Sequence, residues 1–226
     1  MTTPPFPILF EDNHLLVIDK PAGIATQGVT DGTSVFDQAS EYIRVKYQKP
    51  GKVYLGIVSR LDTVTSGVLV LARTSKAASR LSDMLRRRTI EKRYLAVVEG
   101  TLPDAEGTLV DFVRKDDAAH RMVVCRESTA DAKRAELRYR VIESSGRQSL
   151  IEVELITGRK HQIRLQLASR GMPVIGDRKY DASSTFPQGI ALHAWQLTFE
   201  HPTKREPMSF ECRPPKSWQR LSVQLP

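Results

Sequence analysis

The stretch that decides the fold runs from Val58 to Arg73 and reads Val-Ser-Arg-Leu-Asp-Thr-Val-Thr-Ser-Gly-Val-Leu-Val-Leu-Ala-Arg. Its first half is a short polar turn that contains Asp62, and its second half, residues 68–72, is an apolar, β-prone run. Hydroxyl side chains and Gly67 favour a tight turn that holds the Asp62 carboxylate in one orientation. Loops fixed by a rigid strand often carry function, but Asp, Ser, Thr and Gly also dominate purely structural turns. These residues therefore fit both a catalytic carboxylate and a structural turn.

The composition predicts a basic globular protein. Of the 226 residues, 40% are hydrophobic, which is enough for a sizeable core in one large or two small domains. Lys and Arg outnumber Asp and Glu by 34 to 26, so the formal net charge is +8. This charge favours polyanionic partners, with nucleic acid first and an anionic membrane second. A basic protein without such a partner fits the same charge.

Cysteine and histidine give no sign of a disulfide framework or a metal site. Cys125 and Cys212 lie far apart in the sequence, and the five histidines lack the spacing of metal ligands. The N-terminus resembles no signal peptide, and no apolar run has transmembrane length. We therefore expect no metal, no membrane association and a reducing, cytoplasmic location.

Hydrophobic periodicity predicts short strands and helices in alternation over the first hundred residues. One helix is expected at 34–47, where Ser34 and Asp37 form a capping box, and another from Thr74 or Ser75 to about Arg88. Strands are expected at 8–10, 15–18, 68–72, 92–100, 108–113, 121–125, 133–142 and 148–156. Residues 114–117 and 143–147 are expected to be turns. Because the later strands follow one another too closely for helical crossovers, the sheet should be largely antiparallel.

The segment Thr-Gly-Arg-Lys-His-Gln-Ile-Arg at residues 157–164 is predicted to open a helix that ends with Gly171 as its C-cap. Arg159, Lys160, His161 and Arg164 would then crowd the first turns, where the helix dipole disfavours cations. An anion nearby would explain this cluster. A basic surface helix is the alternative.

Residues 60–67 resemble the R-L-D-x-x-T-S-G signature of the RluA-type family of RNA pseudouridine synthases, although Ser59 stands where many members have His. Further resemblances follow in order along the chain, from about Leu15 to Pro215. They are K-P-x-G at 20–23, K-x-Y-x-A-x-V-x-G at 92–100, G-R-x-H-Q-I-R at 158–164, P-I-x-G-D-x-x-Y at 173–180, L-H-A-x-x-L at 192–197 and H-P at 201–202.

The resemblance implies an α+β fold, the pseudouridine synthase fold, with a largely antiparallel mixed sheet flanked by helices and a central RNA-binding cleft. It implies one catalytic domain over residues 1–226. The separate N-terminal RNA-binding module that many relatives carry is expected to be absent.

The resemblance also implies roles for individual residues. Asp62 is expected to be the nucleophile, Tyr94 to lie against the target base, and Arg164 to pair with Asp62. Arg60 is expected to occupy the space left when the target base flips out of the RNA. The remaining predicted substrate-binding residues, which would contact the RNA itself, are Lys20, Arg159, Lys160 and His161.

The expected activity is the isomerisation of specific uridines to pseudouridine in a structured stem-loop of ribosomal RNA or tRNA, with no cofactor and no obligate protein partner. One alternative is a non-catalytic RNA-binding or RNA-remodelling module on the same scaffold. Another is a glycosidase that uses Asp62 as nucleophile; a retaining enzyme would need a second carboxylate about 5–5.5 Å away, and no motif identifies one.

Overall fold

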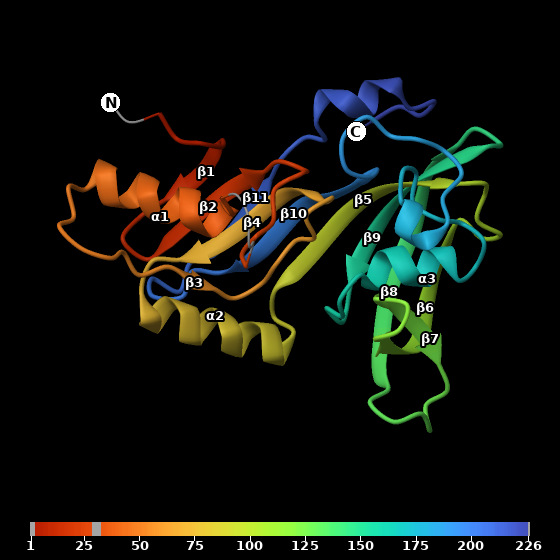
Figure 1. Ribbon diagram of the computed structural model, residues 1–226, viewed down its shortest axis with the longest axis horizontal. Helices are drawn as coiled ribbons and strands as arrows, with labels where there is room; N and C mark the ends of the chain where they lie inside the picture. Colours follow the sequence, from red (N-terminus) through yellow and green to blue (C-terminus); the bar gives the residue numbers. More distant parts are fainter. Residues whose placement is uncertain (1–2, 29–32, 226) are drawn as a thin grey trace. The chain divides into compact units, whose positions relative to one another are not determined.

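The computed structural model describes residues 3–28 and 33–225, which form eleven strands, three α-helices and two short 3₁₀ helices (Figure 1). The chain divides into two compact units, the first comprising Met1–Glu91 and Ala194–Arg213 and the second Lys92–His193 and Pro214–Pro226. The predicted α+β class is confirmed. None of the helices described here is long and apolar enough to cross a membrane.

The first unit contains two helices and six strands. They are β1 (Ile8–Glu11), β2 (Leu15–Lys20), α1 (Val35–Lys46), β3 (Gly56–Ile57), β4 (Ser66–Ala72), α2 (Ser75–Arg87), β10 (Leu192–Glu200), which belongs to this unit from Ala194 on, and β11 (Pro207–Glu211). The strand order is β1-β2-β4-β10, with β3 also paired to β4 and β11 to β10. The pairs β1–β2, β2–β4, β3–β4 and β10–β11 are all antiparallel, as predicted.

Apolar alternation along the strands builds the core of this unit. Val17 of β2 lies opposite Val70 of β4, and both side chains are buried together with Leu197 of β10. Helix α2 covers this face of the sheet with Ala77 and Leu81, and Figure 1 shows it beside β3 and β4. The helix predictions are confirmed, because α1 begins with the Ser34 capping box and Thr74 caps α2.

The second unit contains one α-helix, two 3₁₀ helices and the five remaining strands, of which β5 belongs to it from Lys92 on. They are β5 (Glu91–Glu99), β6 (Glu106–Asp116), β7 (Arg121–Cys125), β8 (Lys133–Ser144), β9 (Gln148–Leu155), α3 (Gln162–Ala168), η1 (Arg178–Tyr180) and η2 (Lys216–Arg220). The strand order is β5-β9-β8-β6-β7, and each pairing is antiparallel. Leu165 of α3 packs against Val113, Met122 and Ala135 on the sheet.

The structure corrects two predicted boundaries. Strand β6 continues to Asp116, which pairs with Arg121 of β7, so most of the predicted turn at 114–117 is strand. Helix α3 begins only at Gln162 and has Ser169, not Gly171, as its C-cap. The reason for the late start is local: His161 has φ +54°, which is incompatible with a right-handed helix, so Arg159, Lys160 and His161 precede the helix.

We predict that Gly67→Ala destabilises the protein strongly. Gly67 has φ +116°, and a Cβ atom there would lie 2.2 Å from the carbonyl oxygen of Ala194, so both the backbone and the neighbouring strand would have to move. The expected loss is about 2–4 kcal/mol of unfolding free energy, measured by urea denaturation. Gly51→Ala is the matched control, because a Cβ there meets nothing within 4 Å. Equal stabilities of the two variants would contradict the prediction.

Candidate active site

The Asp62 turn joins β3 to β4 in the first unit. Its backbone closes through a hydrogen bond from the Thr65 N–H to the Asp62 carbonyl oxygen, at 3.0 Å. Leu61 is buried and anchors the turn, whereas Asp62 is half-buried and Arg60 is exposed. Arg60 makes no hydrogen bond or ion pair with any residue that the structure describes. The turn therefore presents the Asp62 carboxylate beside the long cationic side chain of Arg60, which has no partner among the described residues.

The segment that follows β2 holds this turn in place. The Gly23 N–H donates to the Thr63 carbonyl oxygen at 2.7 Å. The Thr26 hydroxyl donates to the Leu61 carbonyl oxygen at 2.8 Å and accepts from the Leu61 N–H at 3.3 Å. These bonds fix the backbone on both sides of Asp62. Two sequence motifs, K-P-x-G and R-L-D-x-x-T-S-G, thus form one structural feature.

Lys20 lies beneath the turn and is completely buried, with 0% exposure. Its ammonium donates to the carbonyl oxygens of Pro21 at 2.8 Å, Ile24 at 2.7 Å and Thr63 at 3.5 Å. An ammonium has three N–H donors, so these carbonyl groups account for all of them. The structure therefore does not support the RNA contact predicted for Lys20, because its charge faces the protein interior.

Burial also changes the electrostatics around Asp62. Burial lowers the pKa of Lys20 to about 8, and the negative charges of Asp62 and Asp19 oppose this shift. Burial raises the pKa of Asp19, although a hydrogen bond from Cys212 and the charge of Lys20 act the other way. Lys20 thus places a titratable positive charge close to the Asp62 carboxylate.

Arg164 forms a buried ion pair in the second unit. Its Nε and Nη2 atoms donate to the two carboxylate oxygens of Asp177, at 2.6 and 2.8 Å, and the residues are only 4% and 1% exposed. The guanidinium also lies 5.2 Å from the centre of the Tyr180 ring. The Tyr180 hydroxyl is 2.9 Å from His161 Nδ1. The side chains of His161, Arg164, Asp177 and Tyr180 therefore hold one another in fixed positions.

Sequence reasoning missed Asp177 and Tyr180 as parts of this network. Both belong to the P-I-x-G-D-x-x-Y segment. The acidic and the aromatic residue in this motif were the signal in the sequence that could have pointed to them. Their partners lie on another element, so the pairing itself needed the tertiary structure. The predicted contact between Arg164 and Asp62 stays a prediction.

The other predicted site residues occupy less enclosed positions in the second unit. Tyr94 is half-buried on β5, opposite Val153 of β9. Arg159 is exposed and donates from Nε to the Arg134 carbonyl oxygen at 3.0 Å. Lys160 is exposed and makes no polar contact with any described residue. Arg159 and Lys160 precede α3, so of the cations predicted for its first turns only Arg164 lies within the helix.

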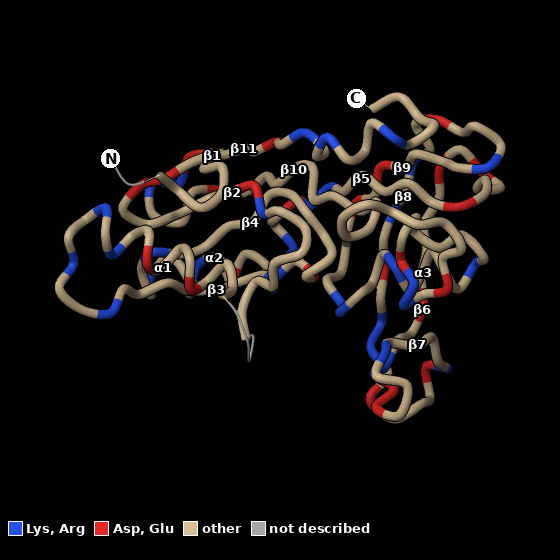
Figure 2. Tube along the Cα trace, turned by 45° about the horizontal axis from the view of Figure 1, so that its top comes forward, with Lys and Arg blue, Asp and Glu red and all other residues tan. Residues whose placement is uncertain are grey.

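Charged side chains are distributed differently over the two units. Figure 2 shows Lys and Arg interleaved with Asp and Glu along the strands of the second unit. Arg93 and Arg140, for example, both bind Glu152, at 2.8 and 2.7 Å. The segment after α1, residues 47–55, carries Lys but neither Asp nor Glu.

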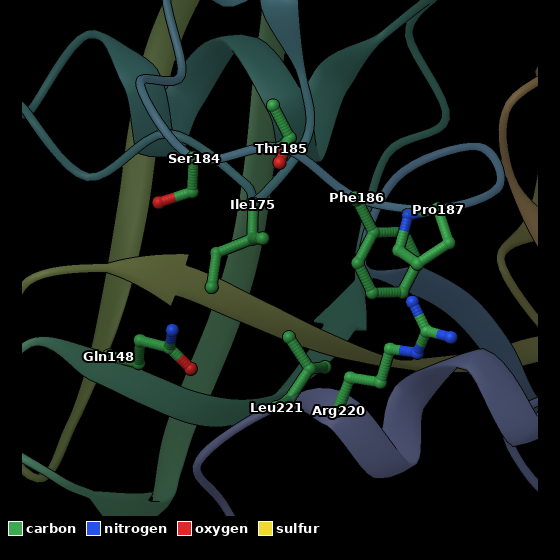
Figure 3. A pocket seen from close by; sticks show the side chains of 8 residues that line it. All are labelled: Gln148, Ile175, Ser184, Thr185, Phe186, Pro187, Arg220 and Leu221. Atoms are coloured by element: carbon green, nitrogen blue, oxygen red, sulfur yellow. The ribbon is translucent and has the colours of Figure 1, made fainter.

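A pocket of about 490 Å³ lies in the second unit, between residues 184–187 and the end of η2 (Figure 3). None of the predicted site residues lines it. Within residues 3–28 and 33–225, no three His, Cys, Asp or Glu side chains gather as a metal site would require.

Comparison with known proteins identifies the family. The family model described as RNA pseudouridylate synthase matches residues 14–169, well over half of the chain. The chain belongs to the RNA pseudouridylate synthase family. It is therefore an RNA pseudouridine synthase, which is an isomerase with an RNA substrate.

Individual relatives of this RNA pseudouridine synthase are similar over most of its length. The uncharacterized RNA pseudouridine synthase YhcT of Bacillus subtilis is 36% identical over 95% of this chain and 70% of its own length. The ribosomal large subunit pseudouridine synthase D of Xanthomonas campestris is 34% identical over 98% of this chain and 70% of its own. The solved structure of human RNA pseudouridylate synthase domain containing 4 superimposes with a TM-score of 0.81 at 26% identity, over 97% and 94% of the two chains. The predicted fold is confirmed.

We predict that Lys20→Met changes how stability depends on pH. The pKa of Lys20 is about 8 in the folded protein and 10.5 ordinarily, so between these values the unfolded chain holds a proton that the folded protein has lost. The unfolding free energy of the wild type should therefore rise with pH relative to that of Lys20→Met, by up to about 3 kcal/mol between pH 8 and 10.5. Chemical denaturation across this range measures it. Lys216→Met, at an exposed lysine, should follow the wild type, and a pH-independent difference for Lys20→Met would contradict the prediction.

We predict that Arg164→Lys costs about 2–4 kcal/mol of unfolding free energy, because lysine cannot make the two-point contact with buried Asp177. Arg170→Lys is the matched control: Arg170 also binds one carboxylate, Asp111, through two nitrogen atoms, but its side chain is 31% exposed. It should cost no more than about 1 kcal/mol. Equal losses in urea denaturation would show that the burial of the Arg164 pair is unimportant.

Proposed function

We propose that this enzyme isomerises uridine in ribosomal RNA, with Asp62 as the nucleophile. The observation that supports Asp62 as the nucleophile is the set of hydrogen bonds that fix its turn. Its turn is fixed by hydrogen bonds donated by the Lys20 ammonium, the Gly23 N–H and the Thr26 hydroxyl, while the carboxylate itself is only half-buried. A nucleophile has to be held in one orientation and still be reached by the substrate, and this arrangement meets both needs.

The reaction breaks the bond between ribose C1′ and uracil N1, turns the base, and forms a bond between C1′ and C5. The proton on C5 is lost and N1 gains one, so uridine and pseudouridine have the same atoms. The Asp62 carboxylate would form a covalent intermediate, either at C1′ or with the uracil ring, and the resemblance fits both routes. Arg164 would hold the Asp62 carboxylate through a charge-assisted contact.

The target base has to leave the RNA stack to reach the carboxylate, at a cost of a few kcal/mol. Arg60 suits the role of filling the vacated space, because its side chain is exposed and has no partner among the described residues. Tyr94 would offer its ring to the extruded uracil, and stacking of this kind contributes about 1–3 kcal/mol. Arg159, Lys160 and His161 would bind the RNA backbone near the start of α3.

Ribosomal RNA is the proposed substrate because several relatives, including the Xanthomonas enzyme, are named for the large ribosomal subunit. A tRNA stem-loop is the second candidate. The net charge of +8 supports binding to either polyanion, and the low cysteine content supports action in the cytoplasm.

We predict that Asp62→Asn abolishes pseudouridine formation, with a loss of about 10³-fold or more, while RNA binding survives. Asparagine keeps the shape of the side chain but is a poor nucleophile. Removal of a negative charge cannot weaken attraction to phosphates, so affinity should be at least that of the wild type. The measurement is pseudouridine mapping of total RNA from cells that lack the protein, complemented with wild type or variant, together with gel-shift titration.

Asp131→Asn is the matched control, because Asp131 is exposed and makes no polar contact with any described residue. It should restore every pseudouridine that the wild type restores. Normal turnover by Asp62→Asn would exclude Asp62 as the nucleophile. If the pseudouridine that depends on this protein lies in tRNA, tRNA and not ribosomal RNA is the substrate. If cells that lack the protein have the same pseudouridine map as wild-type cells, the non-catalytic RNA-binding alternative is favoured.

A further inference from the structure

Lys92 is a half-buried lysine whose ammonium has no partner among the residues that the structure describes. It lies near the start of β5, and no described residue accepts a hydrogen bond from it or forms an ion pair with it. Burial lowers the pKa of Lys92, and no neighbouring charge contributes to the shift. Enclosing a cation without a counter-charge is unfavourable, so a reason is needed for a lysine at this position.

The comparison with Lys20 makes the contrast clear. Lys20 is more deeply buried than Lys92, but three carbonyl oxygens accept its three N–H groups. Arg93, the neighbour of Lys92 on β5, donates to Glu152 at 2.8 Å. Lys20 and Arg93 therefore have hydrogen-bond partners, whereas Lys92 has none among the described residues.

The position of Lys92 on β5 relates it to the predicted site. Side chains alternate between the faces of a strand, so Lys92 and Tyr94 share one face and Arg93 occupies the other. Ala96 and Val98 continue the face of Lys92 and Tyr94 and are completely buried. Lys92 thus extends a core-facing row by one position beyond the residue expected to contact the target base.

The loop before α3 approaches the ammonium through a residue with no side chain. A Cβ atom at Gly158 would lie 3.4 Å from Lys92 Nζ, in ordinary contact with it, so an alanine there would take up part of the space beside the charge. The next residues in the loop are Arg159 and Lys160, both exposed cations. This neighbourhood has the positive charge and the space that an anion requires.

We propose that the Lys92 ammonium, in the space left by Gly158, binds one backbone phosphate of the substrate RNA next to the nucleotide whose base contacts Tyr94. This proposal rests on the proposed function. Lys92 is a residue that touches substrate, and it fixes the position of the target nucleotide from the phosphate side. The phosphate in turn supplies a counter-charge that no residue described by the structure provides.

The test uses a synthetic RNA stem-loop with a uridine in its loop and a series of copies that each carry one uncharged methylphosphonate in place of a phosphate near that uridine. For the wild type, one position should reduce affinity about tenfold, as expected for the loss of one charge-assisted contact. Lys92→Met should reduce affinity for the unmodified RNA by the same factor and be insensitive to methylphosphonate at that position. Its slope of log affinity against log salt should be smaller by about 0.7–0.9.

Three variants keep the result interpretable. Lys216→Met, at an exposed lysine on η2, should retain both the affinity and the methylphosphonate profile of the wild type. Lys92→Arg keeps the charge and should restore part of the affinity. Gly158→Ala narrows the space beside Nζ and should weaken binding at the same phosphate.

The proposal is overturned if Lys92→Met has the methylphosphonate profile of the wild type. It is also overturned if this variant loses turnover while its affinity and salt slope are unchanged, since Lys92 would then act on the base and not on a phosphate. The proposed function is tested separately, by pseudouridine formation in the wild type. If the wild type forms no pseudouridine, the proposed function fails, but the methylphosphonate binding profile still tests whether Lys92 contacts a phosphate.

Discussion

A single buried ammonium joins the two segments that surround Asp62. Lys20 ends β2, and its charge is distributed over carbonyl oxygens that belong to its own loop and to the Asp62 turn. Without this donor, the carbonyl groups would remain buried and unsatisfied, at about 1–3 kcal/mol each. The turn could then relax only by moving Asp62. Lys20 is therefore a positioning residue, and its proximity to Asp62 adds an electrostatic role to the structural one.

The protein treats its enclosed cations in three different ways, and each corresponds to a different task. Lys20 is satisfied by backbone carbonyls and fixes a loop. Arg164 is satisfied by the Asp177 carboxylate, which leaves its planar guanidinium oriented against the Tyr180 ring. Lys92 has no partner among the described residues, and we assign its partner to the substrate. In the sequence, all three are basic residues within a motif. Their burial and contacts distinguish them: Lys20 supports a loop, Arg164 is held in one orientation, and Lys92 is assigned to substrate binding.

Local patterns predicted most of the secondary structure correctly. The capping box of Ser34 and the hydrophobic spacing behind it produced α1, because these signals act between residues within one or two turns. The errors occurred where a distant partner or an unusual backbone angle prevailed. Strand β6 continues through charged residues because β7 pairs with it, and α3 begins late because His161 adopts a left-handed conformation.

The sequence by itself determined the fold class, the family and the turn that presents Asp62, since all of these depend on residue types at short, fixed spacings. Only the tertiary structure decided that Lys20 faces the interior, that Arg164 binds Asp177 and that half-buried Lys92 has no counter-charge among the described residues. A motif specifies which group is present but not which group it meets. The partner of a charge depends on where packing brings distant segments together, and its burial depends on the whole surrounding core.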